Sequence, residues 1–174
     1  YYMLSHLRME GKYFIKNTSE EKAKHEHVIM HFADNTDLRY HDTRKFGRMK
    51  IIPKYALYET EEIKKQGKEP GSKELTSEYL VSKFKLKKEP IKTALLDQTI
   101  ISGLGNIYAD EVLFASKINP TRPANSITGD EALKIALSSA RIIKKAMEMG
   151  GTTIRSYTSS LGVTGHYQDY LCVH

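Results

Sequence analysis

The sequence is poor in cysteine and has no long apolar run. Cys172 is its single cysteine, which excludes an internal disulfide and a zinc site built from several cysteines. The apolar runs are only a few residues long, far short of the ~20 residues that a membrane-spanning helix needs. Arg8, Glu10 and Lys12 interrupt the N-terminal apolar stretch, so no signal peptide is predicted. These absences favour a reduced, cytoplasmic protein.

The charge excess is small as well. Lysine and arginine number 27 against 21 aspartates and glutamates, and this formal net charge of +6 raises the chance of a polyanionic partner only slightly. Apolar residues make up 40% of the 174 positions and charged residues 28%, as is typical of a folded globular chain. Residues 1–4 and 171–174 both have the apolar pattern of a strand interior. We therefore interpret the sequence as a piece of a longer protein, with Cys172 predicted to be a small buried residue.

Residues 1–58 are predicted to form β-structure. Apolar residues recur at every second position on both sides of a turn cluster at residues 34–37, namely at Val28, Met30, Phe32, Leu38 and Tyr40. This alternation predicts a hairpin of two half-buried strands. Gly11 and Gly47 interrupt strand-like runs, which indicates a bend or a close approach of the backbone at each position.

Residues 59–75 carry prolines, glycines and many charges, and this composition predicts a linker. Residues 76–174 are predicted to be helical. Thr76 or Ser77 can cap a first helix that runs towards Lys87, and Pro90 suits the first turn of the next helix.

The longest predicted helix begins at a capping box formed by Thr128 and Glu131 and ends at Gly150 and Gly151. Its apolar stripe is predicted to consist of Leu133, Ala136, Ala140, Ile143 and Met147. The order of strands, linker and helices gives an α+β fold class and excludes alternating β and α units.

A glycine-containing turn at residues 102–105 is the most informative motif. A helix from about Ile91 is expected to end there, and a second helix is expected to begin with Asn106 as its cap. Glycines let the backbone turn sharply, and the free amides at a helix N-terminus can bind an anion such as phosphate. A plain helix–helix turn is an equally good interpretation, whereas a dinucleotide-binding turn is disfavoured because a third glycine and a preceding strand are missing.

Two further features suggest contact with nucleic acid. A basic cluster precedes the glycine turn and could follow a phosphate backbone, although charge runs are usually solvated surface: Lys83, Lys85, Lys87, Lys88 and Lys92. Phe46 lies among cations in a connection between strands, and either Phe46 or Met9 could enter a base stack as an apolar wedge. The default alternative is that both are core residues. The histidines, among them His25, His27, His31 and His41, lack the spacing of a metal site.

Taken together, the segments resemble formamidopyrimidine-DNA glycosylases, the bacterial enzymes that remove 8-oxoguanine and ring-opened purines. The resemblance rests on residues 4–13, 24–28, 38–47, 91–111, 119–124 and 150–155. It implies the later part of an N-terminal β-sandwich followed by a helix–two-turn–helix domain. It also implies double-stranded DNA containing oxidised purines as the partner of a cytoplasmic monomer.

The resemblance implies a role for individual residues. Met9, Arg44 and Phe46 match the residues that fill the duplex where the damaged nucleotide has flipped out. The residues that match DNA contacts are His6, His25, Lys92, Asn106 and Tyr108. Glu111 matches a residue lining the active site, as Tyr108 also does. Glu10 matches the lesion pocket, and residues 159–167, including Ser159, Thr164 and Tyr167, match the loop that closes over the extruded base.

The chain also departs from the family pattern. The nucleophilic N-terminal proline, the glutamate after it, an early lysine and the four-cysteine zinc finger are not in these 174 residues. The resemblance therefore implies one zinc ion for a full-length member and none for this chain, which we expect to be inactive alone. His174 replaces the usual tyrosine, and residues 67–70 differ from the usual turn. Two alternatives stay open, namely a catalytically inactive DNA-binding relative and an endonuclease VIII-like glycosylase for oxidised pyrimidines.

Overall fold

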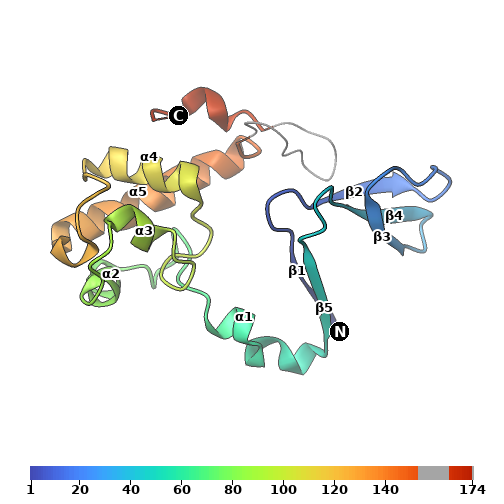
Figure 1. Ribbon diagram of the computed structural model, residues 1–174, viewed down its shortest axis with the longest axis horizontal. Helices are drawn as coiled ribbons and strands as arrows, with labels where there is room; N and C mark the ends of the chain where they lie inside the picture. Colours follow the sequence, from blue (N-terminus) through green and yellow to red (C-terminus); the bar gives the residue numbers. More distant parts are fainter. Residues whose placement is uncertain (153–164, 174) are drawn as a thin grey trace. The chain divides into compact units, whose positions relative to one another are not determined.

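The computed structural model describes residues 1–152 and 165–173, and it divides into two units (Figure 1). The sheet unit comprises Tyr1–Tyr58 together with Met149–Gln168, and the helical unit comprises Glu59–Glu148 together with Asp169–His174. None of the helices in the described ranges combines the length and the hydropathy that spanning a bilayer requires. The α+β fold class is confirmed, with strands first and helices after them.

The sheet unit contains two antiparallel sheets. Strand β1 (Tyr2–His6) pairs with β5 (Arg48–Ile52) in one of them. In the other, β4 (Thr36–His41) lies between β2 (Lys12–Asn17) and β3 (Glu26–His31). The predicted hairpin is confirmed as β3 and β4, but the connection lies at residues 32–35 and not at the predicted 34–37. Asn35 occupies the left-handed region of that turn with φ 63°, a conformation that asparagine adopts more readily than most residues.

The close backbone approach predicted at Gly11 and Gly47 is confirmed. A Cβ atom at either position would collide with the hydroxyl group of Tyr40, whose side chain is only 5% exposed. The packing of Tyr40 therefore favours glycine at both positions, and at Gly11 the Leu7 carbonyl oxygen leaves even less room for a Cβ atom.

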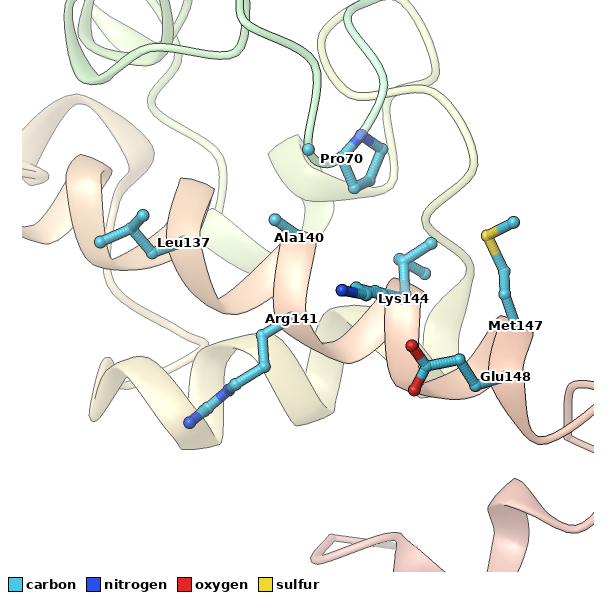
Figure 2. A pocket seen from close by; sticks show the side chains of 9 residues that line it. Pro70, Leu137, Ala140, Arg141, Lys144, Met147 and Glu148 are labelled. Atoms are coloured by element: carbon cyan, nitrogen blue, oxygen red, sulfur yellow. The ribbon is translucent and has the colours of Figure 1, made fainter.

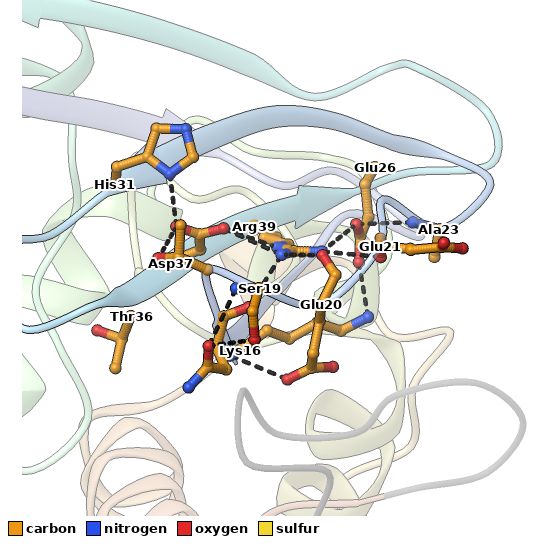
Figure 3. A network of polar contacts seen from close by, with 12 residues as sticks. Lys16, Ser19, Glu20, Glu21, Ala23, Glu26, His31, Thr36, Asp37 and Arg39 are labelled. Carbon is orange, nitrogen blue, oxygen red and sulfur yellow. Dashed lines mark hydrogen bonds and ion pairs between the residues drawn. The ribbon is translucent and has the colours of Figure 1, made fainter.

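A network of ion pairs and hydrogen bonds on the three-stranded sheet is centred on the buried Arg39 of β4 (Figure 3). The Arg39 guanidinium bonds the carboxylates of Asp37 and Glu26 at 3.0 and 3.2 Å, and all three residues are 1% exposed. Arg39 also donates to the carbonyl oxygens of Asn17 and Glu20, at 3.1 and 2.7 Å. One side chain on β4 thus holds the connection between β2 and β3 against the sheet.

The helical unit contains five α-helices within the described residues. They are α1 (Glu61–Lys64), α2 (Ser77–Phe84), α3 (Ile91–Leu95), α4 (Asn106–Ser116) and α5 (Gly129–Glu148). Short 3₁₀ helices lie at η1 (Lys54–Glu59), η2 (Ala124–Ser126) and η3 (Tyr167–Tyr170). Helix α5 packs against α2 and α4. The core between the helices is aliphatic and aromatic, including Leu80, Phe84, Ile91, Leu113 and Ile135, each at most 1% exposed.

Two predicted helix starts are confirmed. Thr76 caps α2 by accepting a hydrogen bond from the amide of Tyr79 at 3.2 Å. In the capping box, the Thr128 amide donates to Glu131 at 2.9 Å and the Glu131 amide donates to the Thr128 hydroxyl at 3.3 Å. Arg122 also forms an ion pair with Glu131. This pair, together with the hydrogen bond from the Thr128 amide, lowers the pKa of Glu131 to about 2.

Other helical predictions are wrong in detail. Helix α2 ends at Phe84, before Lys87, and Pro90 is the N-cap of α3, which extends only to Leu95. The N-cap of α4 is Gly105, and Asn106 is the first helical residue. Glycine is a tolerated cap, and its extended backbone lets the chain enter α4 from the turn.

The predicted apolar stripe of α5 is also wrong. Its buried face consists of small and β-branched residues, namely Ala132, Ile135, Ala136, Ser138, Ser139, Ile142 and Ala146. Leu133 is 48% exposed and Met147 is 76% exposed. Helix α5 has two apolar stripes, and the one with smaller side chains allows the closer helix contact.

Two further expectations differ from the structure. Residues 67–68 lie inside the predicted linker but pair with the segment before α4. The amides of Gly67 and Lys68 donate hydrogen bonds to the carbonyl oxygens of Gln98 and Ile100. Cys172, which was expected to be buried near a strand end, is exposed and follows a 3₁₀ helix.

Candidate nucleic-acid interface

Two loops of the sheet unit bring Met9, Arg44 and Phe46 together. A guanidinium nitrogen of Arg44 lies 3.5 Å from the sulfur of Met9, and Arg44 Cζ lies 4.7 Å from the centre of the Phe46 ring. Met9 is 77% exposed and Phe46 is 53% exposed, so the alternative that they are core residues is wrong. We call these three residues the insertion cluster.

The turn at residues 7–11 presents Met9. The amide of Gly11 closes the turn by donating to the Leu7 carbonyl oxygen at 3.1 Å. Glu10 accepts a hydrogen bond from the Thr43 hydroxyl, which links this turn to the loop of Arg44 and Phe46. His6, at the end of β1, accepts from the amide of Arg8 at 3.1 Å and thereby sets the start of the turn.

His25 lies at the start of β3 among other basic groups. Its ring centre is 6.3 Å from that of His27 and 5.7 Å from that of His41. Burial first, and then Lys24, the two histidines and Lys45, lower the pKa of His25. The positive potential at this position comes from Lys24 and Lys45, and such a potential attracts an anion such as phosphate.

Three of the basic residues in these loops have left-handed backbone conformations. The φ angles are 58° at Arg8, 71° at His25 and 58° at Lys45. Residues with a Cβ atom rarely adopt this region. Each of these positions therefore carries backbone strain that a glycine would not have.

The helical unit contributes the glycine turn before α4. Gly103 has φ 86°, which requires glycine. The side-chain amide of Gln98 accepts from the Gly103 amide and donates to the Leu104 carbonyl oxygen, both at 2.8 Å. This role of Gln98 could not be predicted from the sequence, because side-chain hydrogen bonds to the backbone of a turn leave no periodic signal.

Lys92 lies on α3 and its side chain reaches α4, as the predicted folding of the two segments requires. Its ammonium group bonds Asp110 at 2.8 Å, and Asp110 lies one turn after Asn106. Lys87 pairs with Glu89 and Asp97 at 3.1 and 3.0 Å. Part of the predicted basic cluster is therefore neutralised by acidic neighbours.

Helix α4 also carries Tyr108 and Glu111. Tyr108 is half-buried in the first turn of the helix. Glu111 is 4% exposed, and its carboxylate accepts from the amides of Cys172 and Val173 at distances of 2.8–3.0 Å. In this structure, Glu111 therefore anchors the residues that follow η3.

Of the predicted lid residues, Tyr167 is buried and its amide donates to the Gly151 carbonyl oxygen at 3.1 Å. Ser159 and Thr164 lie outside the described residues. Within the described part of the chain, no group of three or more His, Cys, Asp or Glu side chains could hold a metal ion.

A hollow on the exposed face of α5 is separate from these residues (Figure 2). It is lined by Pro70, Gly71 and the α5 residues Leu137, Ala140, Arg141, Ile143, Lys144, Met147 and Glu148. No residue of the candidate interface contributes to it, and it coincides with the second apolar stripe of α5.

Comparison with known proteins identifies two domains. The family described as "Formamidopyrimidine-DNA glycosylase N-terminal domain" matches residues 1–49, and "Formamidopyrimidine-DNA glycosylase H2TH domain" matches residues 66–158. Among named relatives, the formamidopyrimidine-DNA glycosylase of Listeria monocytogenes is 46% identical over 172 residues, which cover 99% of this chain and 63% of the relative. That of Ligilactobacillus salivarius is 48% identical over 166 residues, covering 95% of this chain and 60% of the relative.

Solved structures give the same result. The Lactococcus lactis Fpg in complex with DNA containing an abasic site has a TM-score of 0.88 at 38% identity, covering 97% of this chain and 62% of that one. A complex of the wild-type Lactococcus lactis protein with N7-benzyl-Fapy-dG DNA has a TM-score of 0.89 at 38% identity, covering 99% and 62%. The chain thus spans about three fifths of the length of the relatives that it matches, and it belongs to the formamidopyrimidine-DNA glycosylase family.

Proposed function

We propose that the protein to which this chain belongs removes oxidised purines, such as 8-oxoguanine and formamidopyrimidines, from duplex DNA and cleaves the resulting abasic strand. The insertion cluster is the observation that carries this proposal. An exposed methionine and an exposed phenylalanine, with an arginine between them, lie outside the core of the sheet unit. Such side chains suit a base stack that has been opened.

The insertion cluster supports a base-flipping mechanism. A glycosylase must extrude its target nucleotide before it can reach the glycosidic bond, and unstacking costs a few kcal/mol. Met9 and Phe46 would fill the space left by the flipped base, and Arg44 would pair with the orphaned cytosine. These contacts form only after extrusion, so they favour the opened duplex over the closed one.

Phosphate contacts would hold the duplex in register for this step. His25, with its basic neighbours, and Lys92 and Asn106, at the start of α4, are the proposed contacts, together with His6 and Tyr108. Contacts of this kind position the protein without reading sequence. Glu10 is proposed to border the lesion pocket, with Ser159, Thr164 and Tyr167 in the loop over the extruded base and Glu111 lining the active site.

The bond-breaking chemistry is proposed to depend on residues that these 174 positions do not include. Family resemblance assigns nucleophilic attack on the sugar C1′ to an N-terminal proline, and this chain opens with Tyr1. One cysteine cannot supply a four-cysteine zinc site, so we assign a zinc ion only to the longer protein. We propose that the protein acts as a monomer in the cytoplasm, where bacterial DNA lies.

Borohydride trapping on an 8-oxoguanine duplex tests the proposed activity of the full gene product. A trapped covalent adduct and a nicked strand are the expected results, whereas the 174-residue chain alone should yield neither. A full gene product that binds the duplex without either product would support the inactive relative instead. Preference for an oxidised pyrimidine would support the endonuclease VIII-like alternative.

Gel-shift titrations on lesion and plain duplexes test the roles of individual residues. Phe46→Ala should weaken binding to the lesion duplex more than binding to the plain one, because the wedge acts only in an opened stack. Phe32→Ala is the matched control, since Phe32 is also about half exposed in the sheet unit, at 50% against 53%. Equal losses on both duplexes for Phe46→Ala would contradict the wedge.

Lys92→Ala and Asn106→Ala should weaken binding to both duplexes alike, because phosphates carry little sequence information. The slope of log binding constant against log salt concentration should become shallower by about 0.9 for each phosphate contact that is lost. Lys64→Ala is the control, because Lys64 also makes an ion pair with a carboxylate, at 2.8 Å from Glu59. Unchanged plain-duplex affinity in both variants would leave the turn with a structural role only.

A further inference from the structure

Asp42 connects the loop of Arg44 and Phe46 to the sheet. Its carboxylate is 1% exposed and accepts a hydrogen bond from the Tyr40 hydroxyl at 2.6 Å. It also accepts from three backbone amides, those of Arg44 at 2.9 Å, Phe46 at 3.0 Å and Gly47 at 3.1 Å. All three amides belong to the segment that carries two members of the insertion cluster.

Tyr40 connects the same carboxylate to the turn of Met9. Its hydroxyl lies 2.9 Å from where a Cβ on Gly11 would be and closer still to where one on Gly47 would be, so it packs against the backbone of both loops. Gly11 closes the turn that presents Met9. The Tyr40–Asp42 pair therefore contacts both loops that form the insertion cluster.

The backbone of Asp42 reaches the proposed phosphate contact. Its amide donates to the carbonyl oxygen of His25 at 3.0 Å, and its own carbonyl oxygen lies 2.8 Å from Nε2 of His27. One residue thus links the phosphate-binding region to the insertion cluster through bonds within the sheet unit.

Packing alone does not hold the loop of Arg44 and Phe46. Residues 43–46 are all exposed, so their side chains contribute little buried area to fix the backbone. The hydrogen bonds to Asp42 are charge-assisted, which makes them roughly twice as strong as neutral ones. We therefore expect the Asp42 carboxylate to be the main group that orders residues 43–47 in the protein without DNA.

We propose that Asp42, together with Tyr40, is a positioning pair that preorganises the insertion cluster for entry into the opened base stack. The inference rests on the proposed function and adds to it a buried residue that acts through the loop it orders. Preordering the loop lowers the conformational entropy that is lost on binding. The pair should therefore favour binding to an opened duplex and have little effect on binding to a closed one.

The ionisation of the pair agrees with this role. Burial by itself would raise the pKa of Asp42, but the Tyr40 hydroxyl and the loop amides hold it well below the usual range. Burial, and then the bond to Asp42, raise the pKa of Tyr40 to about 12. Asp42 therefore stays an acceptor and Tyr40 a donor over the whole neutral range.

Asp42→Asn is the principal test, because it keeps the size of the side chain but turns one acceptor group into a donor. Tyr40→Phe removes a single donor and keeps the ring, so it serves if the first variant does not fold. Asp34→Asn is the matched control, since Asp34 accepts from the Thr36 amide at 3.1 Å in an exposed turn of the same hairpin. All three are compared with the unaltered full gene product on plain duplex and on duplex with a tetrahydrofuran abasic site.

Affinity for the abasic duplex should fall about 10- to 100-fold in Asp42→Asn, the range that corresponds to losing a hydrogen bond to a charged group. Plain-duplex affinity should stay within about threefold, and Asp34→Asn should change neither. Tyr40→Phe should show the same selective loss at smaller size. An equal loss on both duplexes, or no loss on either, would overturn the positioning role.

Amide hydrogen exchange of the free protein separates this inference from the proposed function. Exchange at Phe46 and Gly47 should quicken in Asp42→Asn while exchange in β2 and β4 stays unchanged. Unaltered exchange at those two amides would contradict the inference even if the enzyme is active. If the unaltered protein does not prefer the abasic duplex, the proposed function fails, and the exchange result still decides whether Asp42 orders the loop.

Discussion

The two units bury different kinds of side chain. The sheet unit places an arginine and three carboxylates out of solvent, at Arg39, Glu26, Asp37 and Asp42, while Ile15 and Phe32 remain about half exposed. The helical unit buries mainly leucine, isoleucine and phenylalanine, with Glu111 as a buried carboxylate, and leaves its charged pairs nearer the surface. The sheet unit is stabilised largely by hydrogen bonds between buried charged groups, whereas the helical unit is stabilised largely by buried apolar surface.

The largest difference between the units should come from Arg39→Met. This change leaves Glu26 and Asp37 as buried carboxylates without their shared cation, which typically destabilises by about 3–5 kcal/mol. Native-state hydrogen exchange should show loss of protection in β2 and β4 and unchanged protection in α5. Equal loss of protection in both units would mean that they unfold together. The difference in their buried side chains would then not make one unit less stable than the other.

Acid should act on the sheet unit before the helical unit, because the helical carboxylates with lowered pKa values, such as Asp97 and Glu131, form ion pairs in contact with solvent. Burial would raise the pKa values of Glu26 and Asp37, but bonds from Lys16, Thr18, His31 and Arg39 hold both below the usual range. Their stabilisation is therefore complete above the ordinary carboxyl pKa of about 4 and is lost as the pH falls below it. Two-dimensional NMR during acid titration should show Tyr40 signals disappearing at higher pH than those of Ile135.

Loss of a methyl group should destabilise the helical unit more than the sheet unit. Ile135→Val in α5 removes part of a side chain that is 0% exposed and should cost about 0.5–1.5 kcal/mol. The same change at Ile15 in β2, which is 49% exposed, should stay within about 0.5 kcal/mol. Denaturant unfolding followed by signals from each unit measures both, and a larger effect at Ile15 would reverse the comparison.

The smallest effect is expected for Lys87→Met, the counterpart of Arg39→Met in the helical unit. Lys87 bonds two carboxylates, as Arg39 does, but its side chain is 29% exposed. Ion pairs in contact with water contribute about 0–1 kcal/mol. A loss as large as that of Arg39→Met would show that burial does not explain the difference.

Local signals in the sequence were sufficient for much of the fold. The β3–β4 hairpin follows from alternation around a turn, and the start of α5 follows from Thr128 and Glu131, because each depends on residues close in sequence. The buried face of α5 could not be predicted, since Leu133 and Ile135 begin two competing stripes. Only the packing of α2 and α4 decides between them.

The candidate site shows the same division. Met9, Arg44 and Phe46 were identified by family resemblance, and the wedge-like surroundings of Phe46 were visible in the sequence. Asp42 was missed, although an aspartate before a loop is a known turn signal. Its contact with Tyr40, and the role of Gly11 and Gly47 in accommodating that ring, depend on strand register and loop closure that no short motif encodes.

The left-handed conformations of Arg8, His25 and Lys45 bear on how this protein can be engineered or can drift. Glycine would relieve about 1–2 kcal/mol of backbone strain at such a position. A selection for heat resistance alone would therefore tend to replace these residues with glycine and remove positive charge from the loops that present the insertion cluster. Thermal stability and the proposed DNA binding would then change in opposite directions, so a screen for stable variants has to measure both.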